Sequence, residues 1–262
     1  MTLPDPVRLF TYAANELGRF SRRTRWGMVI ADPRYPRIWD ANNAAVLDPD
    51  PDLTAEQIRA ELDPILRGAG APTEHIEVWE TTVENPALRA LRDERISRVP
   101  DVAMVFDGDS DAVRDEIDLG VEELRDLDAG LWRWYRTTLN EFGDPLDDGV
   151  LDQLLSRIRD VFLPSGLRWF LVRVDGEPAG YTSLISVAGV GYLDSVVTMP
   201  KFRRRGIASA TVGAAVRASA EAGDRVTFLL AEEGGEPQRL YERLGFITTA
   251  RIESFTRPLP TG

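Results

Sequence analysis

The feature that most constrains this sequence is an apolar segment that ends at a proline and passes through an arginine- and glycine-rich turn into a run of small residues. The apolar segment is 192–199, the turn is 201–206, and the small residues continue to about Ala220. This succession predicts a strand, a turn and a helix. The first amides of such a helix lack backbone partners, and the positive end of the helix dipole lies beside them. The sequence therefore predicts an anion site suited to a pyrophosphate, where Gly206 has no Cβ to hold a ligand away.

Several residues of this turn are candidates for contacting the anion. They are Arg203, Arg204, Arg205, Gly206, Ile207, Ala208 and Ser209. The arginines could bind phosphate or could form a solvated cluster that offsets acidic surroundings, and an ordinary helix start remains the alternative to an anion site. A P-loop would need a lysine and a hydroxyl residue after its second glycine, and no Gly-x-Gly-x-x-Gly occurs either. Nucleoside triphosphate hydrolysis is therefore disfavoured.

The composition of the 262-residue chain excludes several kinds of chemistry. The absence of cysteine excludes disulfides, thiolate nucleophiles and cysteine metal sites. A histidine metal cluster or a Ser-His-Asp triad has one candidate histidine, His75. This residue lies beside an alternating segment, where a solvated histidine at a strand edge is favoured over a catalytic one. We therefore predict no metal site.

The net charge restricts the partners of the chain. Forty-three acidic residues against 31 basic ones give a formal charge of −12. Such a field disfavours nucleic acid and membrane surfaces and suits an amine-bearing partner, although an acidic surface often serves only solubility. No apolar stretch is long enough to span a bilayer, and the first residues lack the basic flank and apolar run of a signal peptide. These features predict a cytoplasmic protein.

An acidic stretch marks a predicted domain boundary. Ten residues between Asp107 and Asp128 are acidic and two are basic. We predict a smaller α+β domain over residues 1–110 and a second α/β (α+β) domain over residues 111–262. In the first domain, the patterns predict strands at 26–30, 76–79 and 102–106 and helices at 55–67 and 86–97. In the second, they predict helices at 129–142, 149–163, 207–220 and 237–244, strands at 169–174, 179–187, 192–199, 226–230 and 246–255, and a hairpin turn at Asp175-Gly176.

A second motif follows the arginine-glycine turn in the predicted helix near the end of the chain. Its sequence is Arg-Leu-Tyr-Glu-Arg-Leu-Gly-Phe, residues 239–246. By periodicity alone, Tyr241 is more typical of half-buried packing than of an acid catalyst. Its place after the predicted anion site favours the catalytic interpretation.

Taken in this order, Arg203-x-x-Gly206-x-Ala208 and the tyrosine motif resemble the GCN5-related N-acetyltransferase (GNAT) superfamily. The resemblance covers residues 113–256. It implies a mixed, mostly antiparallel central sheet flanked by helices, and acetyl-coenzyme A (acetyl-CoA) as co-substrate. Because no cysteine is present, it also implies direct attack of a primary amine on the thioester within a ternary complex.

The resemblance assigns roles to particular residues. It implies that the turn 204–209 holds the pyrophosphate, with Arg203 at the position of the first motif residue. It implies that the main chain of Val196, Val197 and Thr198 contacts the pantetheine arm and the acetyl carbonyl. It gives Tyr241 the role of the acid that protonates the departing thiolate.

The sequence departs from the family pattern at two places. Gly234 stands where an asparagine is often found, and residues 227–229 occupy the place of a frequent glutamate. A general base is therefore not assigned by resemblance. Asp194 is our candidate, since two-residue alternation places it on the face of Val196 and Thr198; a surface aspartate paired with an arginine is the alternative.

These observations favour an acetyl-CoA-dependent N-acetyltransferase acting on an amine of a small molecule or peptide. The alternative is a non-catalytic module that binds acyl-CoA or a partner, and nucleic-acid binding through residues 203–205 is least favoured. The resemblance also allows a homodimer, although no sequence feature fixes the oligomeric state.

The N-terminal domain echoes the order of elements in the C-terminal domain. A strand at 76–79, a helix from Pro86 and a strand at 102–106 parallel those at 226–230, 237–244 and 246–255. The first domain has neither the Arg-x-x-Gly-x-Ala turn nor a tyrosine in its helix. We therefore hypothesise a tandem arrangement whose N-terminal copy is a degenerate GNAT-like domain.

Overall fold

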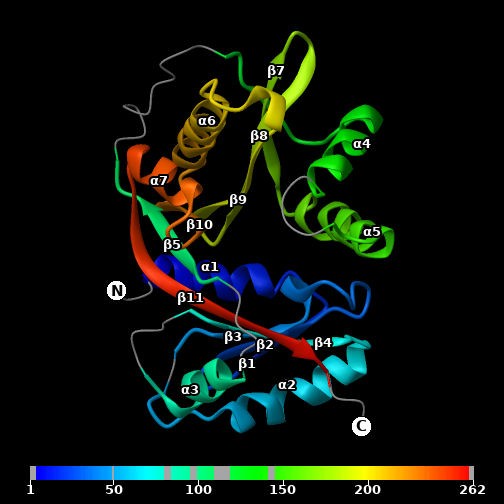
Figure 1. Cartoon of the computed structure of the whole chain (residues 1–262), viewed down its shortest axis with the longest axis vertical. Helices are drawn as coiled ribbons and strands as arrows, with labels where there is room; N and C mark the ends of the chain where they lie inside the picture. Colours follow the sequence, from blue (N-terminus) through cyan, green and yellow to red (C-terminus); the bar gives the residue numbers. More distant parts are fainter. Residues whose placement is uncertain are drawn as a thin grey trace. The chain divides into compact units, whose positions relative to one another are not determined.

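The computed structural model describes residues 4–48, 50–79, 84–94, 99–108, 119–140 and 145–259 (Figure 1). The chain divides into two compact units. Unit 1 comprises Met1–Met104, Ala231–Gln238 and Thr248–Gly262, and unit 2 comprises Val105–Leu230 and Arg239–Ile247. The predicted boundary between residues 110 and 111 lies outside the described residues and stays a prediction.

Unit 1 is built on a sheet with the strand order β1-β2-β3-β4-β11-β5. Its elements are α1 (Asp5–Asn15), β1 (Phe20–Arg23), β2 (Gly27–Ala31), η1 (Trp39–Ala41), β3 (Asn43–Val46), α2 (Ala55–Ala69), β4 (Thr73–Val78), α3 (Pro86–Asp93), most of β5 (Asp101–Phe106) and most of β11 (Phe246–Pro258). β3 and β4 are parallel, whereas β4 and β11 are antiparallel. The last strand of the chain thus pairs with a strand of the N-terminal half.

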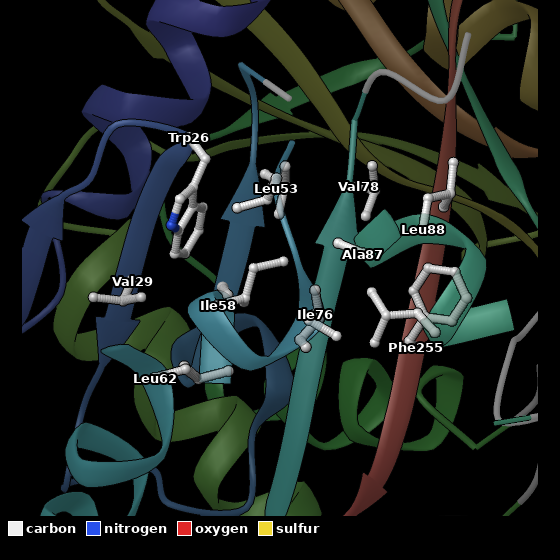
Figure 2. Packing of buried hydrophobic residues seen from close by; sticks show 14 of the residues in the cluster. Trp26, Val29, Leu53, Ile58, Leu62, Ile76, Val78, Ala87, Leu88 and Phe255 are labelled. Carbon is white, nitrogen blue, oxygen red and sulfur yellow. The ribbon is translucent and has the colours of Figure 1, made fainter. Parts of the chain in front are cut away.

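The core of unit 1 lies between this sheet and helices α2 and α3. Figure 2 shows Val29, Ile76 and Phe255 from three strands meeting Ile58 and Leu88 from the two helices. The helical spacing of apolar residues in α2 aligns one face with the sheet, as the sequence predicted. Large side chains of this core have almost no exposed surface, which fixes the strand order around them.

His75 in unit 1 corrects one prediction. It lies in β4, between the neighbouring strands β3 and β11, and is only 2% exposed. The predicted solvated histidine at a strand edge is therefore wrong. The alternating pattern correctly indicated a strand. Whether the face of the sheet that carries His75 is buried depends on the side chains packed over it, such as Trp39, whose ring stacks on the imidazole.

Unit 2 has the strand order β10-β9-β8-β7-β6. Its elements are β6 (Glu122–Leu124), α4 (Ala129–Thr138), α5 (Asp148–Arg157), the π-helical turn η2 (Ile158–Phe162), β7 (Arg168–Val174), β8 (Glu177–Val187), β9 (Val190–Thr198), η3 (Pro200–Phe202), α6 (Ile207–Glu221) and most of β10 (Val226–Glu232); α7 (Glu236–Arg243) is divided between the units. β9 and β10 are parallel, and the other pairs are antiparallel. The predicted mixed, mostly antiparallel sheet is confirmed.

The helices of unit 2 cover both faces of its sheet. α6 lies on one side of β8, and α4 and α5 lie on the other (Figure 1). Asp175 and Gly176, both with positive φ, form the predicted turn between β7 and β8. Among the described residues, no helix is long and apolar enough to cross a membrane.

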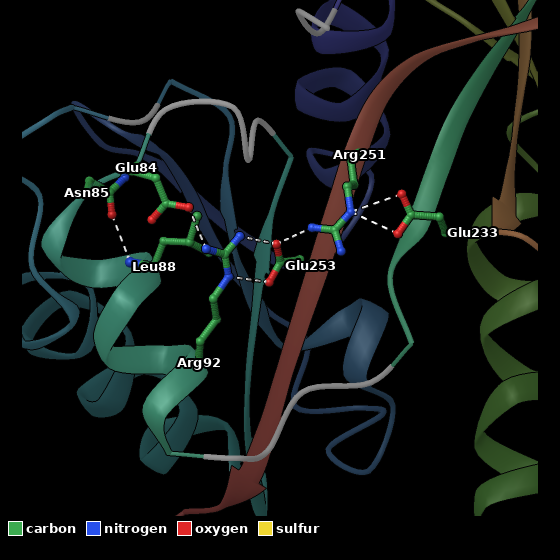
Figure 3. A network of polar contacts seen from close by, with 7 residues as sticks. All are labelled: Glu84, Asn85, Leu88, Arg92, Glu233, Arg251 and Glu253. Atoms are coloured by element: carbon green, nitrogen blue, oxygen red, sulfur yellow. Dashed lines mark hydrogen bonds and ion pairs between the residues drawn. The ribbon is translucent and has the colours of Figure 1, made fainter.

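β11 is fixed in unit 1 by a buried carboxylate between two arginines (Figure 3). Glu253 accepts a hydrogen bond from Arg92 Nε of α3 at 2.8 Å and pairs with Arg251. Arg251 also pairs with Glu233 at 2.9 Å. Burial raises the pKa of Glu253, but the hydrogen bonds and charges of Arg92 and Arg251 outweigh it, so the pKa lies below its ordinary value.

We predict that Glu253→Gln lowers the free energy of unfolding by about 2 kcal/mol at pH 7, because it removes charge-assisted hydrogen bonds from a buried site. Urea unfolding measures this difference. A carboxyl group whose pKa is lower in the folded than in the unfolded state stabilises the folded protein at pH values above its unfolded-state pKa. This stabilisation is lost as the pH falls through the folded-state pKa. The gap between wild type and variant should therefore close below about pH 4.

The matched control is Glu233→Gln, which removes the more exposed carboxylate paired with Arg251. Its cost should be below about 1 kcal/mol, as for exposed ion pairs. Equal losses for the two variants would show that Glu253 does not hold β11 in place.

Candidate cofactor and active site

The candidate site lies where β9 and β10 stop pairing. The parallel pairing joins Val190–Leu193 to Val226–Leu229, but β9 runs on to Thr198 and β10 to Glu232. Beyond Leu193, β9 pairs with β8 on its other edge alone, within the described residues. The edge of β9 at 194–198 thus carries main-chain groups that a bound ligand could use. These include the predicted contacts Val196, Val197 and Thr198.

Gly180 lets the start of α6 approach this open end of β9. A Cβ at this position would lie 2.5 Å from the carbonyl oxygen of Val197 and 2.8 Å from Cγ2 of Ile207. Real side chains do not tolerate such distances, so only glycine permits this packing. Gly180 is not among the residues that the sequence motifs pointed to. A glycine inside a strand pattern signals a close backbone approach and could have revealed it.

The turn into α6 has the predicted open form. Arg204 and Gly206 both have positive φ, at 60° and 77°, and a Cβ on Gly206 would meet no atom within 4 Å. No side chain caps α6, and residues 203–206 are exposed. The amides of Ile207, Ala208 and Ser209 accordingly begin the helix with no hydrogen-bond partner among the described residues. This geometry suits an anion and holds Arg204 in a conformation that costs free energy.

Thr198 leaves a buried hydroxyl without a partner beside this turn. Its Oγ1 has no hydrogen bond in the described part of the chain. Thr198 is opposite Gly180 in the pairing of β8 and β9, on the side of the sheet that faces α6. A buried hydroxyl without a partner destabilises a protein. A ligand in the open end of β9 would satisfy it.

A β-bulge in β9 changes the place of Asp194. Ser183 faces Ser195 and Leu184 faces Leu193, so Asp194 is the additional residue. The bulge interrupts the alternation that placed Asp194 with Val196 and Thr198. That expectation is not met, and spacing across a bulge cannot assign a face.

The electrostatic effect of Asp194 places it near the opposite face. Burial is the main cause that raises the pKa of Tyr181 and of Tyr135, and the carboxylate of Asp194 raises both further. Tyr181 precedes Thr182, which contacts Thr211 of α6, so Tyr181 points to the side of α4. Asp194 itself is exposed. Its Oδ2 accepts a hydrogen bond from Ser195 Oγ at 3.2 Å.

The aromatic residues of α4 form part of the core on this face. The Tyr135 ring lies 5.4 Å from Tyr181, and the Trp132 ring lies 5.8 Å from Trp169. The Tyr135 hydroxyl is deeply buried, and Thr138 reaches the Tyr181 hydroxyl at 3.2 Å. Packing within the core thus accounts for these contacts.

Tyr241 lies in the part of α7 that belongs to unit 2. It is 6% exposed and packs edge-on against Phe246, with ring centres 6.0 Å apart. No group in the described part of the chain hydrogen-bonds its hydroxyl. Burial raises its pKa to about 12. The phenol therefore stays protonated at neutral pH, as a proton donor must.

Comparison with known proteins identifies the same family as the sequence motifs. Residues 129–246 match the Acetyltransferase (GNAT) family. This part of the chain is a GNAT domain, as the motifs indicated. The family uses acetyl-CoA and acts on amine-bearing acceptors, which supports acyl transfer as the general activity. No curated protein matches the sequence.

Solved structures of the same fold extend over most of the chain. A GCN5-related N-acetyltransferase from Kribbella flavida is 18% identical with a TM-score of 0.64, over 97% of this chain and 96% of that one. A functionally unknown conserved protein from Staphylococcus epidermidis is 12% identical with a TM-score of 0.68, over 88% and 90%. A tandem GNAT protein from the clavulanic acid biosynthesis pathway is 15% identical with a TM-score of 0.54, over 79% and 70%. These likenesses show a shared fold, including a tandem form.

The residues present fit acetyl-CoA in unit 2. The open amides of α6 and the exposed arginines suit a diphosphate, and the unpaired edge of β9 with its buried Thr198 hydroxyl suits a polar chain lying along it. Among the described residues, no group of three or more His, Cys, Asp or Glu side chains is placed to hold a metal ion.

In unit 1, β3, α2 and β4 repeat the order of β9, α6 and β10, a strand, a helix and a parallel strand. Unlike β9 and β10, β3 and β4 stay paired to their carboxyl ends. β3 and β4 pair up to Val46 and Val78, and the amide of Trp79 still bonds to the Val46 carbonyl. Thr54 and Gln57 form a capping box that satisfies the start of α2. The features that suit a diphosphate in unit 2 are therefore closed in unit 1.

We predict that Thr198→Val weakens acetyl-CoA binding several-fold without lowering the melting temperature. The isosteric change removes a buried hydroxyl that has no protein partner, so folding loses no hydrogen bond, whereas the ligand loses one. Calorimetry and thermal unfolding measure the two effects. Thr182→Val is the control in the neighbouring strand, because its hydroxyl bonds to Thr211 at 2.8 Å and its loss should lower stability. Unchanged affinity in Thr198→Val would contradict a ligand contact at this hydroxyl.

We further predict one molecule of acetyl-CoA bound per chain. The capped α2 and the fully paired β3 and β4 leave the N-terminal copy without a diphosphate site. The binding stoichiometry from calorimetry tests this prediction. A value near two would show that unit 1 opens to a second molecule.

Proposed function

We propose that this protein is an N-acetyltransferase that transfers the acetyl group of acetyl-CoA to a primary amine of a small molecule or peptide. The observation that carries the proposal is the meeting, in unit 2, of an uncapped helix start with a strand edge that pairs with no other strand in the described ranges and bears the buried Thr198 hydroxyl. Bound acetyl-CoA would supply the thioester. The other parts of the reaction come from the chain.

The binding residues position the thioester. Arg204, Arg205 and the amides of 207–209 would hold the diphosphate, with Arg203 at the edge of the same turn. The main chain of 196–198 would align the pantetheine arm and donate N–H groups to the oxyanion that forms during attack. The amides of 207–209 begin α6 and residues 196–198 end β9, so bound acetyl-CoA would present its acetyl carbon to an incoming amine in a defined orientation.

Two side chains would move protons. Tyr241, whose raised pKa keeps it neutral, would protonate the departing thiolate. An alkylamine with a pKa of about 10 is mostly protonated at neutral pH, so it must lose a proton before attack. The exposed carboxylate of Asp194, on the bulge of β9, is our candidate acceptor of that proton, directly or through water. Direct attack needs no enzyme nucleophile, in accord with a chain that has no cysteine.

We predict that Tyr241→Phe lowers kcat about ten-fold or more while the affinity for acetyl-CoA hardly changes, because only the proton donor is lost. A thiol-release assay over a panel of amines, combined with calorimetry, measures both quantities and identifies the acceptor. Since the pKa of Tyr241 is raised to about 12, its ionisation should not limit the wild-type rate below about pH 11.

The matched control is Tyr12→Phe, which removes a phenol hydroxyl from unit 1, where it contacts Asp48 at 3.1 Å. Its kcat should equal that of wild type. The alternative function, a non-catalytic module that binds acyl-CoA or a partner, predicts cofactor binding without turnover on any amine. Full turnover by Tyr241→Phe would instead assign the proton to another group or to water.

A further inference from the structure

A hydroxyl, an imidazole and a carboxylate lie in line on one face of the unit 1 sheet. Thr256 Oγ1 is 2.8 Å from His75 Nδ1, and His75 Nε2 is 3.2 Å from Glu77 Oε1. Thr256 and His75 are register partners in β11 and β4, and Glu77 follows His75 by two residues on the same face. Trp79 Nε1 donates to the other oxygen of Glu77 at 3.0 Å, which fixes the carboxylate.

The carboxylate decides where the protons lie. Glu77 as an anion can only accept hydrogen bonds, so His75 must donate from Nε2. In the neutral ring, Nδ1 is then an acceptor, and Thr256 donates its hydroxyl proton to it. This order, in which a base contacts a hydroxyl and is oriented by a third group, is the one that activates a nucleophile.

The surroundings restrain the imidazole and leave one polar atom for a ligand. Trp39 stacks on His75 with ring centres 5.6 Å apart and an angle of 16°. Asn43 donates from Nδ2 to the main-chain oxygen of Trp39 at 3.2 Å, but its Oδ1 is buried without a partner in the described part of the chain. An acceptor kept in this state costs stability unless a bound molecule donates to it. Thr256 and Glu77 are only half-buried, so the hydroxyl end of the row is within reach of a small molecule.

Holding the strands together does not account for this row. β4 and β11 already pair along six residues each, from Thr73 to Val78 and from Glu253 to Pro258. The chain also places its only histidine here. A fixed imidazole tautomer and an adjacent unpaired acceptor are additional features that main-chain pairing does not require.

We propose that unit 1 holds a second reactive centre, in which Thr256 is the nucleophile, His75 the base and Glu77 the positioning residue, and that it hydrolyses small activated carboxylic esters. Thr256 Oγ1 forms a bond to the carbonyl carbon as its proton passes to His75 Nδ1, and the ester C–O bond breaks as His75 returns that proton to the leaving oxygen. Water then attacks the acyl-threonine, loses its proton to His75, and releases the acid and the Thr256 hydroxyl. The net change is ester plus water to acid plus alcohol.

The experiment uses p-nitrophenyl acetate with the full-length protein in the absence of acetyl-CoA. Wild type should release nitrophenolate at least ten-fold faster than buffer, and mass spectrometry of quenched protein should find an acetyl group on Thr256. Thr256→Val, which keeps the β-branched shape, and His75→Gln should both reduce release to the buffer rate. Thr256→Ser should retain activity. Thr249→Val, which removes another threonine hydroxyl of β11 that bonds to the Ala103 carbonyl, should have no effect.

A wild-type rate equal to that of buffer, an unchanged rate in Thr256→Val, or acetylation only at other residues would overturn the proposal. Circular dichroism establishes whether each variant is folded. Should Thr256→Val fail to fold, nuclear magnetic resonance of the single imidazole in wild type still decides. A proton on Nε2 with a hydrogen bond to Nδ1 supports the proposal, and a proton on Nδ1 of the neutral ring contradicts it.

Discussion

The structure of the candidate site depends on the point at which two parallel strands stop pairing. The pairing of β9 and β10 ends at Leu193 and Leu229, although both strands continue beyond these residues. This leaves one edge of β9 without a partner strand in the described residues, and Gly180 lets the start of α6 pack against the same end. The positive φ of Gly206 then directs the first amides of α6 outward. A ligand with a diphosphate and an extended polar arm matches this combination.

Unit 1 has a comparable strand, helix and parallel strand without the features of the candidate site. Its parallel strands β3 and β4 stay paired to their ends, and the capping box of Thr54 and Gln57 engages the amide of Gln57 in the first turn of α2. The row of Thr256, His75 and Glu77 lies on the other face of this sheet from the α2 core, so the second centre that we propose does not compete with the packing of that core.

Particular residues show where sequence reasoning succeeded. The positive φ of Asp175 and Gly176 confirms a turn that two residues specify. The helix α6 begins at Ile207, after Gly206, as the arginine-glycine turn predicted. The predicted position of Asp194 on the face of Val196 and Thr198 was wrong because a bulge adds one residue to β9. Two-residue alternation does not continue across a bulge, so it cannot assign a side chain to one face of the sheet. The predicted exposure of His75 was wrong because an alternating pattern indicates a strand but does not show which side chains cover its second face.

The sequence by itself determined the strand-turn-helix of the predicted anion site, the motif around Tyr241 and the family that residues 129–246 match, since these depend on residues close together in the chain. Only the tertiary structure decided that β11 pairs with β4, that Thr198 keeps a buried hydroxyl without a partner, and that Thr256 reaches His75. Those arrangements join residues far apart in sequence. They depend on which apolar surfaces pack together and exclude water. This is a property of the folded chain, and no local sequence pattern specifies it.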